Sequence, residues 1–447
     1  MQNRTDSQPS DSIELQIDSM AFGGKGVGRS SGKVYFVEGG IEGDVARVEV
    51  LQTSERYDEA KVVEIVKPSP HRGKSLCPVS EVCGGCQWQG VPYAKQLEWK
   101  KNFISNALRR IGKIGEDIKI EMMPSPQDNG YRNRIFLRAR LRADGSLVVG
   151  YFRRSSRDFV PINFCTIAVE RLNKFISNLT SLSFLDEFKK GNADSEIKFR
   201  LEIQDIPEIT DASPHVLATI YEPDDSRFSM DEVIKKISAL PSVLWCGNSR
   251  DLHSAPVVPF ETHMNRKFFT APGVFQQINI LHNHTVRQLV YEAVEHFSPR
   301  RILDIYCGSG NLSLAVAGEN RVIDGVEFSK RSIHVAQKNL AEAKLNNANY
   351  YAGDTEKFLW RAAKQGALYD LVIADPPRDG MFKALIPLMK IKPQQIIYIS
   401  CDPTTLSRDL STLCRKDYKV SRFIALDFFP NTYHIESFVI LERNENK

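Results

Sequence analysis

The C-terminal part of the sequence, from about residue 262, alternates strand-like and helical segments. Arg301–Tyr306 is an apolar run of strand length, followed by a glycine-containing loop at 307–311, a helical segment and the next apolar run at Val322–Glu327. Such alternation is typical of a parallel, doubly wound sheet with helices on both faces. We therefore predict a Rossmann-like α/β domain over residues 262–447.

Acidic residues stand near the carboxyl ends of these predicted strands, the edge at which such sheets bind ligands. Asp304 precedes the glycine loop, Glu327 ends the second strand and Asp354 follows the third. Glycines let the loop backbone approach a cofactor, and an acid that ends the second strand can bind ribose hydroxyls. Nicotinamide enzymes share the glycine loop, but the three acids together favour an S-adenosylmethionine-dependent methyltransferase domain.

A cysteine is predicted at the carboxyl end of another buried strand. Ile396–Ser400 is a mainly apolar run, Cys401 follows it, and Pro403 marks the end of the strand. A lone cysteine is most often a small buried hydrophobic residue, and the local sequence leaves this interpretation open. The place of Cys401 at the ligand-binding edge of the sheet also suits a nucleophile.

The Asp-Pro-Pro-Arg motif of residues 375–378 follows a predicted fourth strand. Enzymes that methylate amino groups carry an aromatic residue at the place of Arg378, so the motif disfavours N-methylation. Carbon 5 of uracil accepts a methyl group only after a nucleophile adds at carbon 6, which is a role for a Cys401 thiolate. The C5 proton must then leave, and His434 and Glu436 are candidate bases.

Residues 12–68 contain four short segments of alternating apolar and polar residues: Ile13–Ile17, Lys33–Val37, Val45–Val50 and Ala60–Val66. This pattern is typical of a small β-barrel. The glycine-rich stretch at 23–28 resembles a phosphate-binding loop, but no helical pattern follows it. A hairpin is therefore the better interpretation.

Three cysteines lie close together in a C-x₅-C-x₂-C pattern. They are Cys77, Cys83 and Cys86, and Cys165 is a fourth candidate farther along the chain. Thiolates at this spacing, with glycines between them, indicate a metal centre that is either zinc or a cubane iron-sulfur cluster. The spacing of radical enzymes, C-x₃-C-x₂-C, is absent, so we expect a structural centre that joins two distant segments.

Positive charge is concentrated in the middle of the chain. Residues 71–160 carry a net charge of +9 and residues 1–70 a net charge of −4. Arginines at even spacing, from Arg134 to Arg142, share one face of a predicted strand, and aromatic residues lie between and beside them. This composition suits RNA phosphates and stacked bases, with Arg132 and Arg134 as candidate contacts, although a solvated sheet face is the alternative.

Length and composition agree with three domains. The 447 residues, 42% of them hydrophobic and 26% charged, are ordinary for a globular protein. The predicted divisions are a barrel at 1–68, an α+β central domain at 69–261 and the α/β domain at 262–447. We find no targeting pattern and no apolar run of membrane-spanning length, so we expect a cytoplasmic monomer that has no membrane contact.

Three motifs together resemble the RNA 5-methyluridine methyltransferase family. They are the Asp-Pro-Pro-Arg-x-Gly sequence at 375–380, the strand and cysteine at 396–401, and Phe-Pro-x-Thr-x-His-x-Glu at 429–436. The likeness covers nearly the whole chain, because residues 12–68 also resemble the TRAM domain, an oligonucleotide-binding (OB) type barrel of RNA-modifying enzymes. The barrel and the four cysteines match the family's 23S ribosomal RNA branch, whereas the branch that methylates the tRNA T-loop generally lacks both.

The resemblance implies a role for each motif residue. Cys401 is the nucleophile, Glu436 is the base, and Asp375 orients the uracil beside Arg378. The residues implied to contact S-adenosylmethionine are Gln277, Tyr306, Glu327, Asp354 and Asp375. The four cysteines are implied to bind a [4Fe-4S] cluster, with zinc as the alternative metal.

The implied activity is methylation of uracil C5 in RNA, with 23S ribosomal RNA as the expected substrate. A tRNA or dual-site uridine methyltransferase is one alternative. An RNA-binding protein with an inactive catalytic domain is another, although intact Cys401 and Glu436 argue against it. Asp402 and Asn431 depart from the residues common in the family at these positions, and neither is a proposed reacting group.

Overall fold

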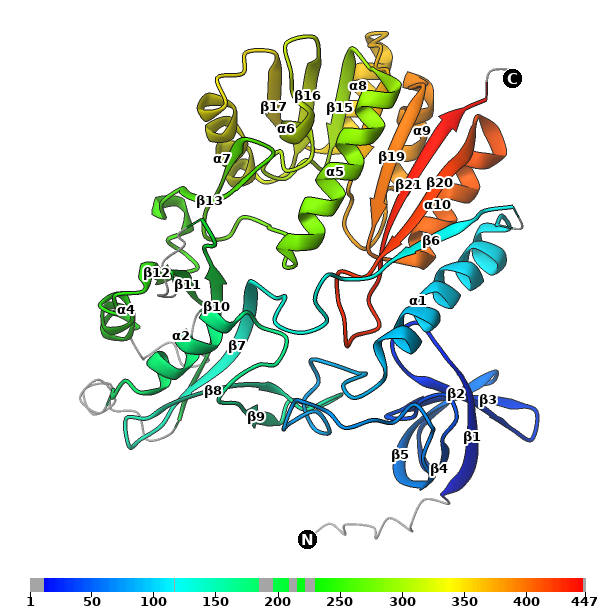
Figure 1. Ribbon diagram of the computed structural model, residues 1–447, viewed down its shortest axis with the longest axis vertical. Coiled ribbons are helices and arrows are strands. Elements are labelled where there is room, and N and C mark those ends of the chain that lie inside the picture. The colour runs from blue at the N-terminus through cyan, green and yellow to red at the C-terminus, as the bar shows by residue number, and fades with distance from the viewer. Residues whose placement is uncertain (1–11, 116, 185–195, 209–214, 222–229, 445–447) are drawn as a thin grey trace, which may run out of the picture.

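The computed structural model describes residues 12–115, 117–184, 196–208, 215–221 and 230–444 (Figure 1). This part of the chain forms a small barrel, a six-stranded sheet and an α/β domain with an eight-stranded sheet. In Figure 1 the α/β domain lies at the top, the six-stranded sheet at the lower left and the barrel at the lower right. None of the described helices has both the length and the apolar character needed to cross a membrane.

The N-terminal barrel is closed, in the strand order β1-β2-β3-β5-β4. Its strands are β1 (Ile13–Met20), β2 (Gly26–Ser30), β3 (Lys33–Glu38), β4 (Val45–Thr53) and β5 (Tyr57–Lys67). Gly23 and Gly24 turn the β1–β2 hairpin with φ angles of 103° and 81°, which glycine adopts without strain. The predicted hairpin is confirmed. The sequence did not indicate β2, because its glycines interrupt the apolar alternation.

The central body is a six-stranded sheet in the order β12-β11-β10-β7-β8-β9. Its strands are β7 (Arg134–Leu141), β8 (Leu147–Phe152), β9 (Phe159–Pro161), β10 (Ile197–Asp205), β11 (Val216–Tyr221) and β12 (Val243–Asn248). Helices α2 (Glu170–Thr180) and α4 (Asp231–Ser238) bury their apolar residues against one face of the sheet, together with alternate residues of β7 such as Ile135 and Leu137. The other face carries the arginines of β7.

The C-terminal sheet has the order β17-β16-β15-β18-β19-β21-β20-β6. Its strands in this domain are β15 (Arg301–Ile305), β16 (Val322–Glu327), β17 (Ala348–Ala352), β18 (Leu371–Ala374), β19 (Gln395–Ser400), β20 (Tyr418–Leu426) and β21 (Glu436–Arg443). Its helices are α5 (Ile280–Phe297), α6 (Ser313–Val316), α7 (Lys330–Glu342), α8 (Thr355–Lys364), α9 (Phe382–Ile391) and α10 (Pro403–Lys416). Strands β15 to β19 are parallel, as predicted, and an apolar cluster covers each face.

One strand of this sheet comes from outside the predicted α/β region. β6 (Ile120–Met123) pairs in parallel with β20 at the edge of the sheet. It follows helix α1 (Tyr93–Ala107) and the helical turn η1 (Leu108–Gly112), which both pack on α10. The elements α1, η1 and β6 therefore pack with the C-terminal domain, although they lie within the predicted central domain at 69–261. The remaining elements, η2 (Leu252–Ser254), β13 (Val258–His263) and β14 (Arg266–Thr270), connect the two sheets.

Candidate functional site

A pocket at the carboxyl edge of the parallel strands has a volume of about 1120 Å³. It is lined by residues that follow β15, β16, β18 and β19 and by the loop before β21. Eight side chains predicted from the sequence meet here: Gln277, Tyr306, Glu327, Asp354, Asp375, Arg378, Cys401 and Glu436. The pocket thus has the predicted cofactor residues and the predicted reactive residues in its wall.

Cys401 and Glu436 are brought together by strand pairing. β19 and β21 are antiparallel, with Ser400 opposite Ser437, so the next positions along the ladder are Cys401 and Glu436. Cys401 is half-buried, and only 4% of the Glu436 surface is exposed. The antiparallel insertion of β21 therefore sets a carboxyl group beside a thiol.

The charges around the thiol oppose its ionisation. Burial, followed by the carboxyl groups of Glu436 and Asp375, raises the pKa of Cys401 to about 12, against the opposing charge of Arg378. Burial raises the pKa of Asp375 to about 7, and burial together with Asp375 raises that of Glu436 well above its usual value. Because two adjacent carboxylates repel each other, one of the pair holds a proton near neutral pH.

His434 lines the same pocket from the loop between β20 and β21. Burial and the charges of Arg378 and Arg132 lower its pKa to about 4, so the imidazole is neutral at physiological pH. It packs against Phe429 and Tyr433, with ring centroids 5.7 Å and 4.0 Å away. A neutral ring in this setting can shape the pocket and accept a hydrogen bond.

The cofactor side of the pocket depends on backbone geometry. Tyr306 has a φ of 61°, an uncommon conformation for a non-glycine residue, where β15 turns into the glycine loop. Glu327 accepts hydrogen bonds from the N–H groups of Ser329 at 2.8 Å and Gly308 at 3.4 Å, which ties the two loops together. Asp354 caps α8 by accepting from the N–H of Lys357 at 2.8 Å.

Buried Asp304 lies under this loop with 1% of its surface exposed. Burial, together with the nearby charges of Asp375 and Glu327, raises its pKa to about 7. An acid in this position is stable only when it is protonated or when donors approach it.

The four predicted metal ligands line one small pocket next to strand β8 of the central sheet. Cys77, Cys83, Cys86 and Cys165 contribute its sulfur atoms. Burial, with a smaller contribution from Cys165, raises the pKa of Cys86 to about 12, and the Gly85 N–H donates to the Cys83 Sγ at 3.4 Å. Within the described residues, no group of three or more metal-binding side chains is arranged to hold a single metal ion.

The two arginines predicted to bind RNA make internal contacts instead. Arg132 lines the cysteine pocket. Arg134 forms an ion pair with buried Glu202 of β10 and donates to the Val274 carbonyl at 3.0 Å. RNA binding by these two residues stays a prediction, and none of these contacts supports it.

Sequence reasoning missed the groups that hold the loop between β20 and β21. Lys100 of α1 and Asp427 form an ion pair of 2.6 Å, and neither side chain is exposed. The Lys100 Nζ also donates to the Phe429 carbonyl at 3.0 Å. The sequence gave no signal for this role of Lys100, because its partner Asp427 lies more than 300 positions away.

Asn431 is the second holding point of this loop. Its φ of 65° is left-handed, a conformation that asparagine tolerates better than most residues. Its N–H donates to Gln96 Oε1 at 2.8 Å, its Nδ2 donates to the Asp128 carbonyl at 2.7 Å, and its carbonyl accepts from Gln87 and Trp88. Gln87 follows Cys86 directly, so the loop that carries His434 and Glu436 is bonded to the cysteine segment.

Comparisons with known proteins match either the C-terminal domain or nearly the whole chain. A family model described as tRNA (uracil-5-)-methyltransferase matches residues 262–444. An uncharacterized RNA methyltransferase of Thermosynechococcus vestitus is 30% identical over 442 residues, 96% of this chain and 97% of the relative. An uncharacterized RNA methyltransferase of Listeria innocua is 28% identical over 465 residues, 99% of this chain and 100% of the relative.

A similar fold is known from a crystal structure. The Pyrococcus abyssi tRNA (uracil-54, C5)-methyltransferase, in complex with S-adenosyl-L-homocysteine, matches with a TM-score of 0.68 and 23% identity. The match covers 96% of this chain and 100% of that chain. At this identity the match supports the fold, including the arrangement of barrel, central sheet and α/β domain.

We expect Asp304→Asn to stabilise the protein at neutral pH. The folded state raises the pKa of this acid from 3.8 to about 7, so it binds more protons than the unfolded state between these values. Stability due to this group therefore falls as the pH rises through that range. The variant should gain about 3 kcal/mol more over the parent at pH 7.5 than at pH 4.5 in urea unfolding. Exposed Asp379→Asn is the control, and an equal gain at both pH values contradicts the prediction.

We expect the two small substitutions of Asn431 to differ in stability. Asn431→Gly keeps the left-handed backbone and loses the side-chain hydrogen bonds, at a cost of about 1–2 kcal/mol. Asn431→Ala loses the same bonds and also strains the backbone, by about 1 kcal/mol more. Urea unfolding measures both, and an alanine variant as stable as the glycine variant would show that the backbone geometry is unimportant.

Proposed function

This chain belongs to the family of RNA uracil-5-methyltransferases, and we propose from that premise that it methylates carbon 5 of a uridine in 23S ribosomal RNA. The observation that carries the proposal is the pairing of Cys401 with Glu436 in one pocket, beside Asp375 and Arg378. A thiol and a buried carboxyl group on the same side of one ligand suit addition at one carbon and proton removal at its neighbour.

Each side chain has a separate task in this reaction. The Cys401 sulfur adds as the thiolate to uracil C6, which makes C5 nucleophilic. After C5 is methylated, a carboxylate form of Glu436 takes the C5 proton, and the bond between sulfur and C6 breaks. Asp375 and Arg378, which line the same pocket, orient the uracil edge. Because the target base sits inside a duplex or a stacked loop, it must leave its stack to reach Cys401.

S-adenosylmethionine supplies the methyl group, as the resemblance to the RNA 5-methyluridine methyltransferase family implies. Glu327, tied to the glycine loop through Gly308, is placed for the ribose hydroxyls. Tyr306, Asp354 and Gln277 line the same cavity. The buried Asp304 under the loop fits a site in which a cationic ligand lies nearby.

The four cysteines that line one pocket favour ribosomal RNA, because they match the ribosomal branch that the sequence resembles. The closed barrel also fits the TRAM domain of that branch, but it does not separate the two substrates, since the match to the Pyrococcus abyssi tRNA enzyme extends over it. A tRNA substrate is the second candidate, because the Pyrococcus abyssi enzyme, named for position 54 of tRNA, matches this chain over its full length.

We further propose that the four cysteines hold a [4Fe-4S] cluster. The resemblance to the ribosomal branch favours a cluster over zinc. A cubane binds each of its four thiolates through a different iron, so it would use all four cysteines of the pocket. The pocket is lined by apolar side chains, including Val79, Ile162 and Phe164, and the amide of Gly85 points at a sulfur, which suits a shielded cluster.

We expect Cys401→Ala and Glu436→Gln to fail at different steps. The alanine variant forms no adduct, so methyl transfer should fall by about 10³-fold or more while S-adenosylmethionine still binds. The glutamine variant should methylate and then stall, leaving a protein–RNA adduct that survives denaturing electrophoresis. Labelled methyl groups are followed into bulk ribosomal RNA and into bulk tRNA, from cells that lack the enzyme.

The unmodified enzyme with 5-fluorouridine RNA is the positive control for the adduct, because fluorine cannot leave as a proton does. Label found in tRNA and absent from ribosomal RNA would favour the second candidate substrate. Methyl transfer to carbon by Cys401→Ala would refute the assigned nucleophile. Free turnover of Glu436→Gln without an adduct would move the base to His434 or Asp375.

We expect anaerobically purified protein to contain about four irons per chain, since a cubane has four. Cys83→Ala should lose the iron and unfold at a lower urea concentration, because the cysteine segment is bonded to the loop at Asn431. Cys246→Ala, a change at a buried cysteine outside the pocket, is the control that keeps the iron. One zinc per chain in place of iron would exclude the cluster.

A further inference from the structure

The glycine loop of residues 307–311 is bonded to two helices by side chains that lie outside the pocket. The loop follows β15 and lines the pocket of Cys401. Gly308 and Gly310 have φ angles of 54° and 78°, so the loop departs from regular strand and helix geometry. Because buried backbone groups need hydrogen-bond partners, the side chains that bond to such a loop also fix its shape.

Asn339 of α7 holds the middle of the glycine loop. Its Nδ2 donates to the Ser309 carbonyl at 2.9 Å, and its Oδ1 accepts from the Phe269 N–H at 2.8 Å. Only 1% of the Asn339 surface and 4% of the Ser309 surface are exposed, so these bonds form away from water, where a hydrogen bond is electrostatically stronger. One carboxamide group thus ties the glycine loop to β14.

Arg287 of α5 holds the end of the glycine loop. Its Nε and Nη2 donate to the Asn311 Oδ1 at 3.0 Å and 2.6 Å, and its Nε also donates to the Asn311 carbonyl at 3.3 Å. Two N–H groups on one edge of a planar guanidinium group fix the orientation of their acceptor. Asn311 itself lines the pocket.

The same guanidinium group is anchored on both strands of the β13–β14 hairpin. Its Nη2 lies 2.8 Å from the Oε1 of Glu261 on β13, and its carbon lies 3.6 Å from the ring centroid of Phe268 on β14. Burial of this charge costs free energy, and apolar side chains of similar volume are often at least as stable in such a place. A guanidinium group with 1% of Arg287 exposed therefore indicates a role that needs its N–H groups, which is the hold on Asn311.

The hairpin that carries both anchors is in turn bonded to the central body. The Glu208 N–H donates to the Phe260 carbonyl at 2.9 Å, and the Thr262 hydroxyl donates to the Glu208 Oε1 at 2.9 Å. Phe260 also packs with Ile206 and Leu217, which belong to the central body. The glycine loop is thus fixed to the connection between the two sheets as well as to its own sheet.

We propose that Asn339 and Arg287 are positioning residues that hold the glycine loop in the shape that binds S-adenosylmethionine. Neither side chain lines the pocket, so each acts through a loop residue, Ser309 or Asn311. The proposal rests on the proposed function, which supplies the cofactor, and it adds two residues that the sequence motifs did not indicate. A loop held in its binding shape avoids the cost of becoming ordered when the ligand binds.

The test measures binding of S-adenosylhomocysteine to the full-length protein by calorimetry. Asn339→Leu removes both hydrogen bonds at nearly constant volume and should weaken binding about tenfold. Asn339→Asp keeps the acceptor for the Phe269 N–H and, at alkaline pH, places a carboxylate beside the Ser309 carbonyl, so a similar loss is expected. Arg287→Lys keeps the charge beside Glu261 but loses the paired N–H groups, and it should also weaken binding about tenfold.

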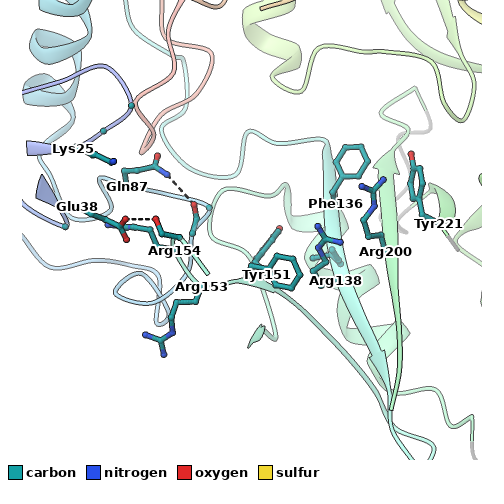
Figure 2. Close-up of a pocket in the computed structure, with 18 residues that line it drawn as sticks. Lys25, Glu38, Gln87, Phe136, Arg138, Tyr151, Arg153, Arg154, Arg200 and Tyr221 are labelled. Carbon is teal, nitrogen blue, oxygen red and sulfur yellow. Dashed lines mark hydrogen bonds between the residues drawn. The ribbon is translucent and has the colours of Figure 1, made fainter. Parts of the chain in front are cut away.

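Two controls lose comparable hydrogen bonds elsewhere and should keep the parent affinity. In Asn347→Asp the lost Nδ2 donor serves the carbonyls of Gly318 and Arg321, near the start of β16 and away from the pocket. Tyr221, labelled in Figure 2, lies on the central sheet, and Tyr221→Phe removes its 2.6 Å hydrogen bond to Glu202.

Steady-state methylation separates positioning of the loop from a general structural role. The KM for S-adenosylmethionine should rise about tenfold in Asn339→Leu. The KM for RNA and the kcat at saturating cofactor should change by less than about twofold, because Cys401 and Glu436 are placed by the pairing of β19 with β21.

Equal S-adenosylhomocysteine affinity of the parent, Asn339→Asp and Arg287→Lys would overturn the proposal, as would an equal loss in Asn347→Asp. Methyl transfer to uridine with a KM for the cofactor that is independent of both residues refutes the positioning role and leaves the activity in place. Cofactor binding that depends on Asn339, in a protein that transfers no methyl group to uridine, supports the positioning role and refutes the activity.

Discussion

The buried ion pair between Lys100 and Asp427 is the interaction on which the catalytic geometry depends. Both side chains are fully buried, and the Lys100 Nζ lies 2.6 Å from the Asp427 Oδ1. The Lys100 Nζ also donates a hydrogen bond to the carbonyl of Phe429. Removing one partner of such a pair leaves an uncompensated charge, at a cost of about 3–5 kcal/mol. The pair joins α1, from the N-terminal half of the chain, to the loop that leads into Glu436. The N-terminal half therefore helps to position the proposed base.

Burial is the main cause of the raised pKa values of the proposed nucleophile and base, and the pairing of β19 with β21 adds to it at the thiol. Antiparallel register places Glu436 beside Cys401, so a negative charge on the carboxyl group opposes ionisation of the thiol. The resting thiol therefore holds its proton. A base that is protonated together with its neighbouring Asp375 removes much of this repulsion. Reactivity of the thiol therefore depends on the protonation state of the carboxyl pair Glu436 and Asp375.

The sequence predicted features that depend on local order along the chain. Parallel strands β15 to β19 follow from apolar runs separated by helices, and the acids at their ends meet because such ends share one edge of a sheet. Contacts between distant segments could not be predicted from the sequence. Even spacing in β7 showed which arginines share a face, but not that Arg134 meets Glu202 across the sheet. Gln96, which bonds to Asn431, lies 335 positions away from it. Strand β6 lies within the predicted central domain but pairs with β20 of the C-terminal sheet.

The loop from Asp427 to Glu436 is the meeting point of all three bodies. From the barrel, Phe22 packs on Tyr433 with ring centroids 5.4 Å apart; from α1, Gln96 and Lys100 hold its backbone. The cysteine segment binds the same loop through the N–H groups that follow Cys86. A loop with so many partners cannot move without disturbing each of them, since packed interfaces resist continuous deformation. The barrel is thus a structural neighbour of the reactive site, a contribution that its composition did not indicate.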